Sequence, residues 1–161
     1  MNTPAFAITY VDKSLIQVSG EIGLVSLGLE KNFSRYSLGG LYGWVPAEIS
    51  GGPMIETVTL RQTYRFWDWQ KLDFYGGLNI FHVLGLDYQT EDFKDAPKRY
   101  YPIGSFRALL NLGIAVRMQP QNTFYFEAGM NDIWIENFLA NTDEVNPSNH
   151  VSLGMGFKHS F

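Results

Sequence analysis

Hydrophobic and polar residues alternate along most of this chain, in segments separated by turn residues. From Phe106 to Met118 every even-numbered residue is apolar, whereas the odd-numbered residues include Arg107, Asn111 and Arg117. Because successive side chains of a β-strand point to opposite faces, a period of two residues predicts strands rather than helices. The pattern therefore predicts an all-β protein.

The alternation recurs often enough to predict eight strands. The first is expected near residues 5–18, where Phe6, Ile8 and Tyr10 alternate weakly. An amphipathic segment over residues 1–18 is the alternative for this part of the chain. The other strands are expected near residues 20–30, 35–45, 56–66, 72–83, 105–118, 123–131 and 150–161.

The connections between these strands alternate in length. Residues 67–71 and 119–122 form short connections, whereas residues 84–104 and 132–149 form long, polar ones. Antiparallel strands joined in this way place short turns at one end of a sheet and long loops at the other. Closure into a barrel would leave no edge strand unpaired, so we expect an eight-stranded antiparallel barrel.

The two faces of the strands indicate which side meets solvent. The polar face carries many glycines and isolated charges, unlike the dense charged surface of a soluble sheet. The apolar face is nearly unbroken, and a tilted strand of about 9–11 residues crosses a bilayer. Since lipid requires every backbone polar group to be bonded within the protein, a closed transmembrane barrel fits. A soluble, lipocalin-like carrier of an apolar ligand is the alternative.

The last predicted strand carries the most specific signature. Apolar or aromatic residues occupy alternate positions up to Phe161, with Phe157 among them and His159 as a departure. The chain thus resembles the small, eight-stranded β-barrel proteins of the bacterial outer membrane, by pattern over residues 20–161. This resemblance implies an outer-membrane location, short periplasmic turns and long extracellular loops. It also implies that Phe157 and Phe161 are the signal read by the barrel-assembly machinery.

Composition narrows the possible functions. The 161 residues predict a single domain over residues 1–161, and the net charge of -4 argues against nucleic-acid binding. There is no cysteine, and the three histidines show no metal-binding spacing, so we expect neither a metal nor another cofactor. The N-terminal residues have no signal-peptide pattern.

Charged residues on the inward face are expected to fill the barrel. An eight-stranded barrel is just wide enough for its own side chains, and charges in such a space need partners. Hairpin pairing predicts three ion pairs and three further lumen charges. The pairs are Arg65–Asp73, Arg117–Glu127 and Arg35–Glu30, and the further charges are Arg61, Arg107 and Lys158.

The four tryptophans lie near predicted strand ends. We expect Trp67 and Trp69 at the periplasmic membrane interface, and Trp44 and Trp134 at the opposite one. Aromatic side chains of this kind form girdles at the headgroup level of outer-membrane barrels. Anchoring at the membrane interface would explain these four tryptophans without a bound ligand.

The long loops are the predicted functional surface. We expect residues 84–104 and 132–149 to contact lipopolysaccharide, an extracellular ligand or another envelope protein, in a structural or surface-interaction role. The resemblance raises a lipid A-modifying enzyme, a deacylase or acyltransferase, as the alternative. His150 and Ser152 have the His-x-Ser spacing of the deacylases, but Leu153 replaces the Asn that follows in that family. Both side chains also belong to the inward face, so the sequence favours a protein without enzymatic activity.

Overall fold

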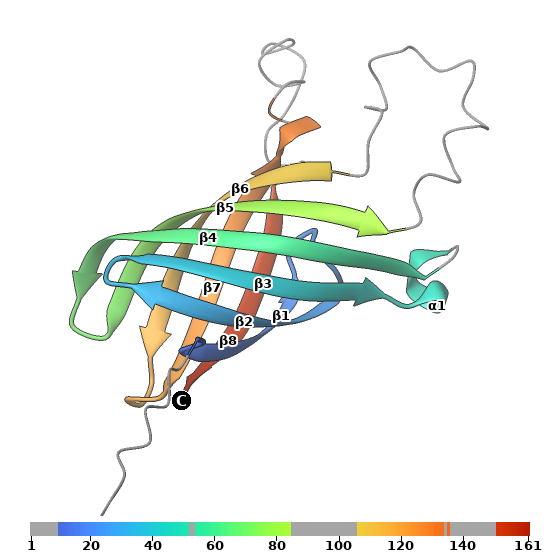
Figure 1. Ribbon diagram of the computed structural model, residues 1–161. Coiled ribbons are helices and arrows are strands. Elements are labelled where there is room, and N and C mark those ends of the chain that lie inside the picture. Colours follow the sequence, from blue (N-terminus) through green and yellow to red (C-terminus); the bar gives the residue numbers. More distant parts are fainter. Residues whose placement is uncertain (1–9, 52–53, 85–105, 134, 136–150) are drawn as a thin grey trace, which may run out of the picture.

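A computed structural model describes residues 10–51, 54–84, 106–133, 135 and 151–161, and shows a closed barrel of eight antiparallel strands (Figure 1). The strands are β1 (Lys13–Ser19), β2 (Val25–Phe33), β3 (Tyr36–Val45), β4 (Ile55–Trp69), β5 (Leu72–Leu84), β6 (Phe106–Arg117), β7 (Asn122–Asn131) and β8 (Ser152–Ser160). Each strand pairs with the next, and β1 pairs with β8 to close the barrel. The predicted all-β, eight-stranded antiparallel barrel is confirmed.

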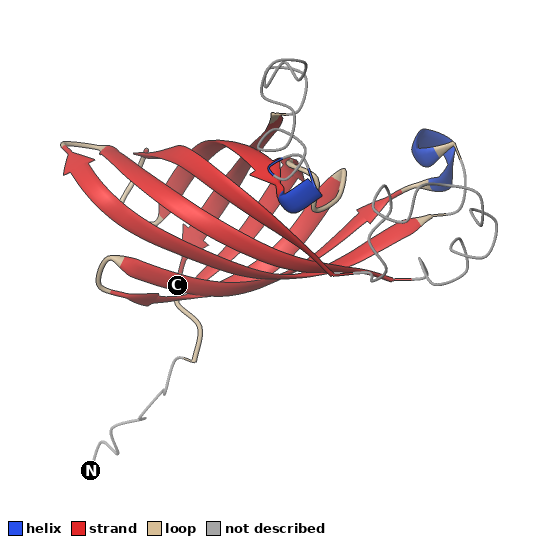
Figure 2. Ribbon diagram, turned by 90° about the horizontal axis from the view of Figure 1, so that it is seen from above, coloured by secondary structure: helices blue, strands red, loops and turns tan. Residues whose placement is uncertain are grey.

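The two ends of the barrel differ in their connections. The β2–β3, β4–β5 and β6–β7 hairpins turn at the end that holds Asp12 and Phe161, where the Phe161 amide donates to the Asp12 carbonyl at 3.0 Å. We call this the terminal end. The opposite, loop end carries the β1–β2 turn and helix α1 (Ala47–Ser50), as Figure 2 shows from above. Among the described residues, no helix has the length and hydropathy of a membrane span.

The first third of the chain departs from the predicted boundaries. β1 covers Lys13–Ser19, and β2 begins at Val25 rather than near residue 20. The intervening turn has positive φ at Glu21 (64°) and Gly23 (139°), which a strand does not accommodate. Residues 13–19 therefore form the first strand, whereas residues 1–9 lie outside the described part of the chain.

The turn predicted at residues 67–71 is shorter in the structure, because a β-bulge lengthens β4. The β4–β5 register shifts between Arg65 and Trp67, which leaves Phe66 as the extra residue. A bulge of one residue inverts the alternation beyond it. Trp67 and Trp69 therefore face outward, each 55% exposed, although the preceding alternation would point them inward. As a result β4 continues to Trp69, and the hairpin turns at residues 70–71.

The outer wall of the barrel is apolar on every strand. Large hydrophobic side chains are exposed from β1 to β8, including Leu27, Leu60, Leu112 and Leu153. Monomeric soluble proteins rarely expose contiguous apolar patches of more than a few hundred Å². The outer wall of the barrel is therefore a continuous surface of exposed apolar side chains.

The interior is filled by side chains of both kinds. The inward set includes fully buried Gln17 and Arg61. It also includes an apolar cluster that the sequence analysis did not anticipate, made of Leu15, Ile22, Leu41, Phe81 and Leu109. Ile22 enters this cluster from the β1–β2 turn and is completely buried. That turn therefore closes the loop end of the interior with an apolar side chain.

Candidate functional site in the barrel interior

An ion pair between Arg61 and Glu127 lies in the centre of the barrel. Arg61 extends from β4 and Glu127 from β7, and their side chains are 0% and 3% exposed. The guanidinium donates through Nη2 to Oε2 at 2.7 Å and through Nη1 to Oε1 at 3.0 Å. Such a two-pronged contact fixes geometry as well as charge. It joins strands that are not neighbours in the sheet.

Three polar side chains extend the hydrogen bonding around the Glu127 carboxylate. Gln17 Nε2 donates to Glu127 Oε1 at 2.9 Å, and the Tyr75 hydroxyl donates to Oε2 at 3.2 Å. The Tyr125 hydroxyl donates to Gln17 Oε1 at 2.9 Å, and its ring centroid lies 5.1 Å from the Arg61 guanidinium carbon. Each carboxylate oxygen thus accepts two hydrogen bonds, which compensates for the burial of its charge.

Two inward-facing glycines make room for the tyrosine rings of this cluster. A Cβ added at Gly113 would overlap the ring of Tyr75, and one added at Gly156 would overlap the ring of Tyr125. Gly113 lies on β6 and Gly156 on β8. The phenol ends of the tyrosines can therefore approach these strands only because the facing residues lack side chains.

We expect Gly156→Val to lower the free energy of unfolding by about 1–3 kcal/mol, because the new side chain must displace the Tyr125 ring and also crowd the Ile16 carbonyl in a packed interior. Gly40→Val is the matched control, since an added Cβ at this outward-facing strand position has nothing within 4 Å. Urea unfolding of both variants measures the difference. Valine has a higher strand propensity than glycine, so Gly40→Val should be neutral or stabilising, and equal losses in the two variants would contradict ring packing as the cause.

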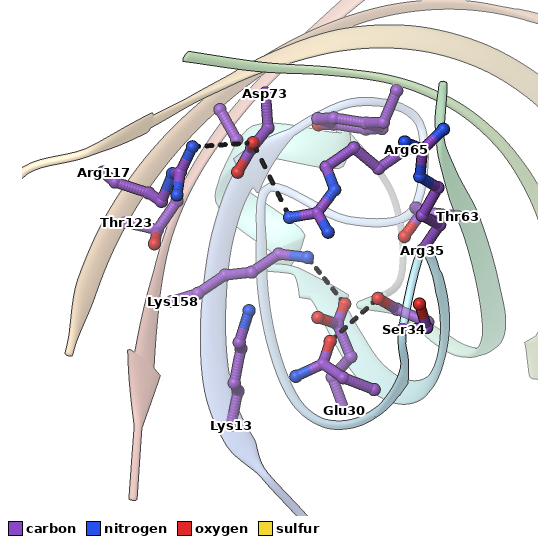
Figure 3. Close-up of a pocket in the computed structure, with 14 residues that line it drawn as sticks. Lys13, Glu30, Ser34, Arg35, Thr63, Arg65, Asp73, Arg117, Thr123 and Lys158 are labelled. Carbon is purple, nitrogen blue, oxygen red and sulfur yellow. Dashed lines mark hydrogen bonds and ion pairs between the residues drawn. The ribbon is translucent and has the colours of Figure 1, made fainter. Parts of the chain in front are cut away.

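A charged cavity of about 270 Å³ lies between this cluster and the terminal end (Figure 3). We call it the vestibule. In it, Lys158 of β8 pairs with Glu30 of β2, with Nζ and Oε2 2.6 Å apart. Asp73 Oδ1 lies 3.2 Å from Arg117 Nη2 and 3.7 Å from Arg65 Nη1, so two guanidinium groups share one carboxylate.

Of the three predicted ion pairs, only that between Arg65 and Asp73 is present. The predicted partner of Arg117 was Glu127, but the β6–β7 register places Arg117 opposite Thr123, so Arg117 reaches Asp73 instead. Glu127 lies four residues beyond Thr123 along β7, where Arg61 faces it across the lumen.

The predicted Glu30–Arg35 pair is also replaced. The β2–β3 hairpin turns at residues 34–35, which pairs Glu30 with Gly39 and leaves Arg35 exposed at the vestibule rim. Lys158 pairs with Glu30 from β8. The remaining predicted lumen charge, Arg107, lies near the loop end, where its Nη1 donates to the Phe106 carbonyl at 3.4 Å.

The other predicted site residues are dispersed. The Ser152 hydroxyl donates to the Gly129 carbonyl at 3.2 Å, while His150 lies outside the described residues, as does Trp134. Trp44 is partly buried near the loop end of β3. In the part of the chain that the structure describes, no three His, Asp or Glu side chains are placed to hold a metal ion.

The two C-terminal signal residues differ in their surroundings. Phe157 packs edge-on against Phe124 of β7, with ring centroids 5.1 Å apart. Phe161 is 72% exposed. Its ring lies 6.2 Å from that of His159, the polar departure in the alternating set. Phe157 lies on the outer face of β8, and Phe161 directly follows that strand at the terminal end.

Two carboxylates outside the strands have shifted pKa values. Hydrogen bonds from Lys31 and from the Asn32 amide lower the pKa of Asp12, which precedes β1. Burial raises the pKa of Glu21 in the β1–β2 turn, although Asn131 donates to this carboxylate at 2.8 Å. The Asp12 contacts tie the start of β1 to the end of β2.

Sequence reasoning missed three members of the central cluster, Gln17, Tyr75 and Tyr125. All three occupy inward-facing positions of the two-residue alternation, which is the signal that could have identified them. No protein-family model matches the sequence, and no curated protein matches it. The structure itself therefore defines the class: a closed eight-stranded antiparallel barrel with an apolar outer wall and a filled, charged interior.

Proposed function

We propose that this chain is an integral β-barrel of the bacterial outer membrane, with its outer wall in contact with lipid. The observation that carries the proposal is the exposure of large apolar side chains on every strand, around an interior that buries the Arg61–Glu127 pair. In water this arrangement would expose the apolar side chains and desolvate the charges, both at a cost. In a bilayer the outer wall is favourable, and closure of the barrel satisfies the backbone.

A soluble carrier of apolar ligands fits these observations less well. Such a barrel needs an internal cavity lined by apolar side chains and a polar outer surface. The vestibule, a cavity inside the described part of the barrel, is lined by Lys158, Glu30, Asp73 and three arginines. The charged lining favours the membrane proposal.

The proposed role is structural or concerned with surface contact. Side chains that fill the interior, Arg61 and Ile22 among them, favour this role over transport. In the proposed orientation the terminal end faces the periplasm, and residues 84–104 and 132–149 face outward to meet lipopolysaccharide, an extracellular ligand or an envelope protein. Those two segments lie almost entirely outside the described residues. Outward-facing Trp67 and Trp69 then lie at the periplasmic interface, where aromatic side chains are favoured.

Expression behind an export signal in a Gram-negative host tests this proposal. The protein should fractionate with the outer membrane and require detergent for extraction. Unboiled samples should migrate differently from boiled ones on a denaturing gel, because a closed barrel resists unfolding by detergent at room temperature. A protein that is folded and monodisperse without detergent would overturn the proposal.

Phe161→Asp should impair insertion in cells more than it impairs stability. Phe161 lies at the terminal end, where a charge facing the interface costs only about 0–1 kcal/mol of folding free energy. If the assembly machinery reads the last residue, however, the variant should be depleted from the outer membrane. The measurement compares its level in isolated membranes with its yield on refolding in detergent.

Phe33→Asp is the control for this substitution. Phe33 is an exposed aromatic at the same end of the barrel, 54% accessible, but lies far from the C-terminus in sequence. It should insert normally. Normal insertion of Phe161→Asp, or equal depletion of both variants, would contradict the assignment of Phe161 as an assembly signal.

A further inference from the structure

The vestibule has an excess of positive charge that its own residues do not neutralise. Five cationic side chains line it against two carboxylates, an excess of three. The cations are Lys13, Arg35, Arg65, Arg117 and Lys158, and the carboxylates are Glu30 and Asp73. A cleft that is lined mainly by one sign of charge and has low-dielectric walls concentrates its field on ions that enter it.

Each carboxylate of the vestibule already has a cationic partner, although Glu30 Oε1 and Asp73 Oδ1 have no hydrogen-bond partner among the described residues. Glu30 accepts from Lys158, and Asp73 is shared by Arg65 and Arg117. The Arg65 Nε is buried and has no hydrogen-bond partner among the described residues. This donor and the remaining charge are therefore available to a ligand.

The other two cations lie at the rim of the vestibule. Lys13 extends from the start of β1 and Arg35 from the β2–β3 turn, and both line the cavity, as Figure 3 shows. In the described part of the chain, neither has a carboxylate within 4.0 Å. Lys13 and Arg35 therefore add positive charge at the terminal end beside Arg65, whose backbone amide donates to the Arg35 carbonyl at 2.8 Å.

We propose that the vestibule binds a phosphate-bearing anion of at least two negative charges, such as pyrophosphate or a phosphate monoester. The cations surround the cavity from β1, the β2–β3 turn, β4, β6 and β8, so a ligand must offer oxygens in several directions. A tetrahedral phosphate does so, whereas one guanidinium fork already satisfies a planar carboxylate. The volume of about 270 Å³ accommodates more than one phosphate group.

This site goes beyond the proposed function and does not depend on a membrane location. If the barrel lies in an outer membrane with the proposed orientation, the vestibule opens to the periplasm. Its ligand would then be a soluble periplasmic phosphate or the headgroup of an inner-leaflet lipid. Both sources present the same chemical group to the cations.

Titration calorimetry of the full-length protein in a non-ionic detergent tests the proposal, with pyrophosphate as the probe at low ionic strength. We expect saturable binding at one site that weakens as salt is added, because salt screens charges at a solvent-accessible cavity. Micelles doped with phosphatidic acid form a second arm. Binding of pyrophosphate indicates a soluble ligand, and binding in the doped micelles alone indicates a lipid headgroup. Absence of binding in both arms would overturn the proposal.

Substitutions of single arginines distinguish binding at a specific site from general electrostatic attraction of anions. Arg35→Gln removes one rim cation without breaking an ion pair, so it should fold normally and weaken binding several-fold. Arg65→Gln should weaken it about tenfold or more, the loss expected for a charge-assisted hydrogen bond to phosphate. Arg107→Gln is the matched control, because it makes the same charge change near the loop end, outside the vestibule. Equal weakening by Arg35→Gln and Arg107→Gln would contradict a specific site.

Discussion

Arg61→Met should lower the free energy of unfolding by about 3–5 kcal/mol, since it leaves the buried Glu127 carboxylate without its counter-ion. Met retains much of the volume of the arginine stem, so the loss reports the charge rather than a cavity. Gln17 and Tyr75 would still donate to the carboxylate, but neither supplies a positive charge. Urea unfolding in lipid vesicles, followed by tryptophan fluorescence, measures the loss.

The double variant Arg61→Met/Glu127→Gln should recover part of that loss. Its neutral amide can still accept a hydrogen bond from Gln17, and no buried charge remains unpaired. The surface pair Lys31–Asp12 provides the comparison, because Lys31→Gln removes a pair that is about one third exposed on both sides and should change stability far less. If the double variant were less stable than Arg61→Met alone, the charge argument would be wrong.

The strand pattern from β3 onward could be predicted from sequence because one physical constraint dominates it. Every strand has an apolar outer face, and its inner face is mainly small or polar apart from the buried apolar cluster, so a period of two residues marks the element. The predicted strand boundaries were wrong where the backbone departs from regular strand geometry. The positive φ values at Glu21 and Gly23 displaced the start of β2, and the bulge at Phe66 displaced the β4–β5 turn.

The partners inside the barrel could not be predicted in the same way. Hairpin reasoning considers only adjacent strands, whereas Arg61 and Glu127 meet across the lumen from β4 and β7. Glu30 and Lys158 meet from β2 and β8, on either side of β1. Such contacts depend on the stagger of the closed sheet, which a list of strands does not contain. A shift of one residue in a turn also changes every pair along its hairpin.

The vestibule could not be predicted from the sequence for the same reason: its charges come from strands that are not all adjacent. Each of its charges belongs to the inward-facing set that the alternation identifies or, as for Arg35, to a hairpin turn. Their convergence at one end follows from the closure of β1 on β8, through which Lys158 and Glu30 come together. The sequence alone suggested a basic excess inside the barrel, but it could not place that excess in a single cavity.

Leu112→Arg should distinguish a lipid-facing wall from a wall that meets water. Leu112 is 66% exposed on the outer face near the middle of β6, opposite Gly76 of β5 and Ala128 of β7. If this face contacts the bilayer core, the arginine should cost about 2–4 kcal/mol of unfolding free energy in lipid vesicles. If the face meets water, a substitution at an exposed site should stay within about 0.5 kcal/mol. Urea unfolding in vesicles provides the measurement.

Met118→Arg controls for the introduced charge. Met118 is 59% exposed and follows β6 directly, at the terminal end of the barrel. There the arginine reaches the interface, so its cost should fall to about 0–1 kcal/mol. A depth-dependent difference between the two positions requires a low-dielectric slab around the barrel, because water would treat both residues alike. Equal, small effects at both positions would place the outer wall in water and contradict the proposed membrane location.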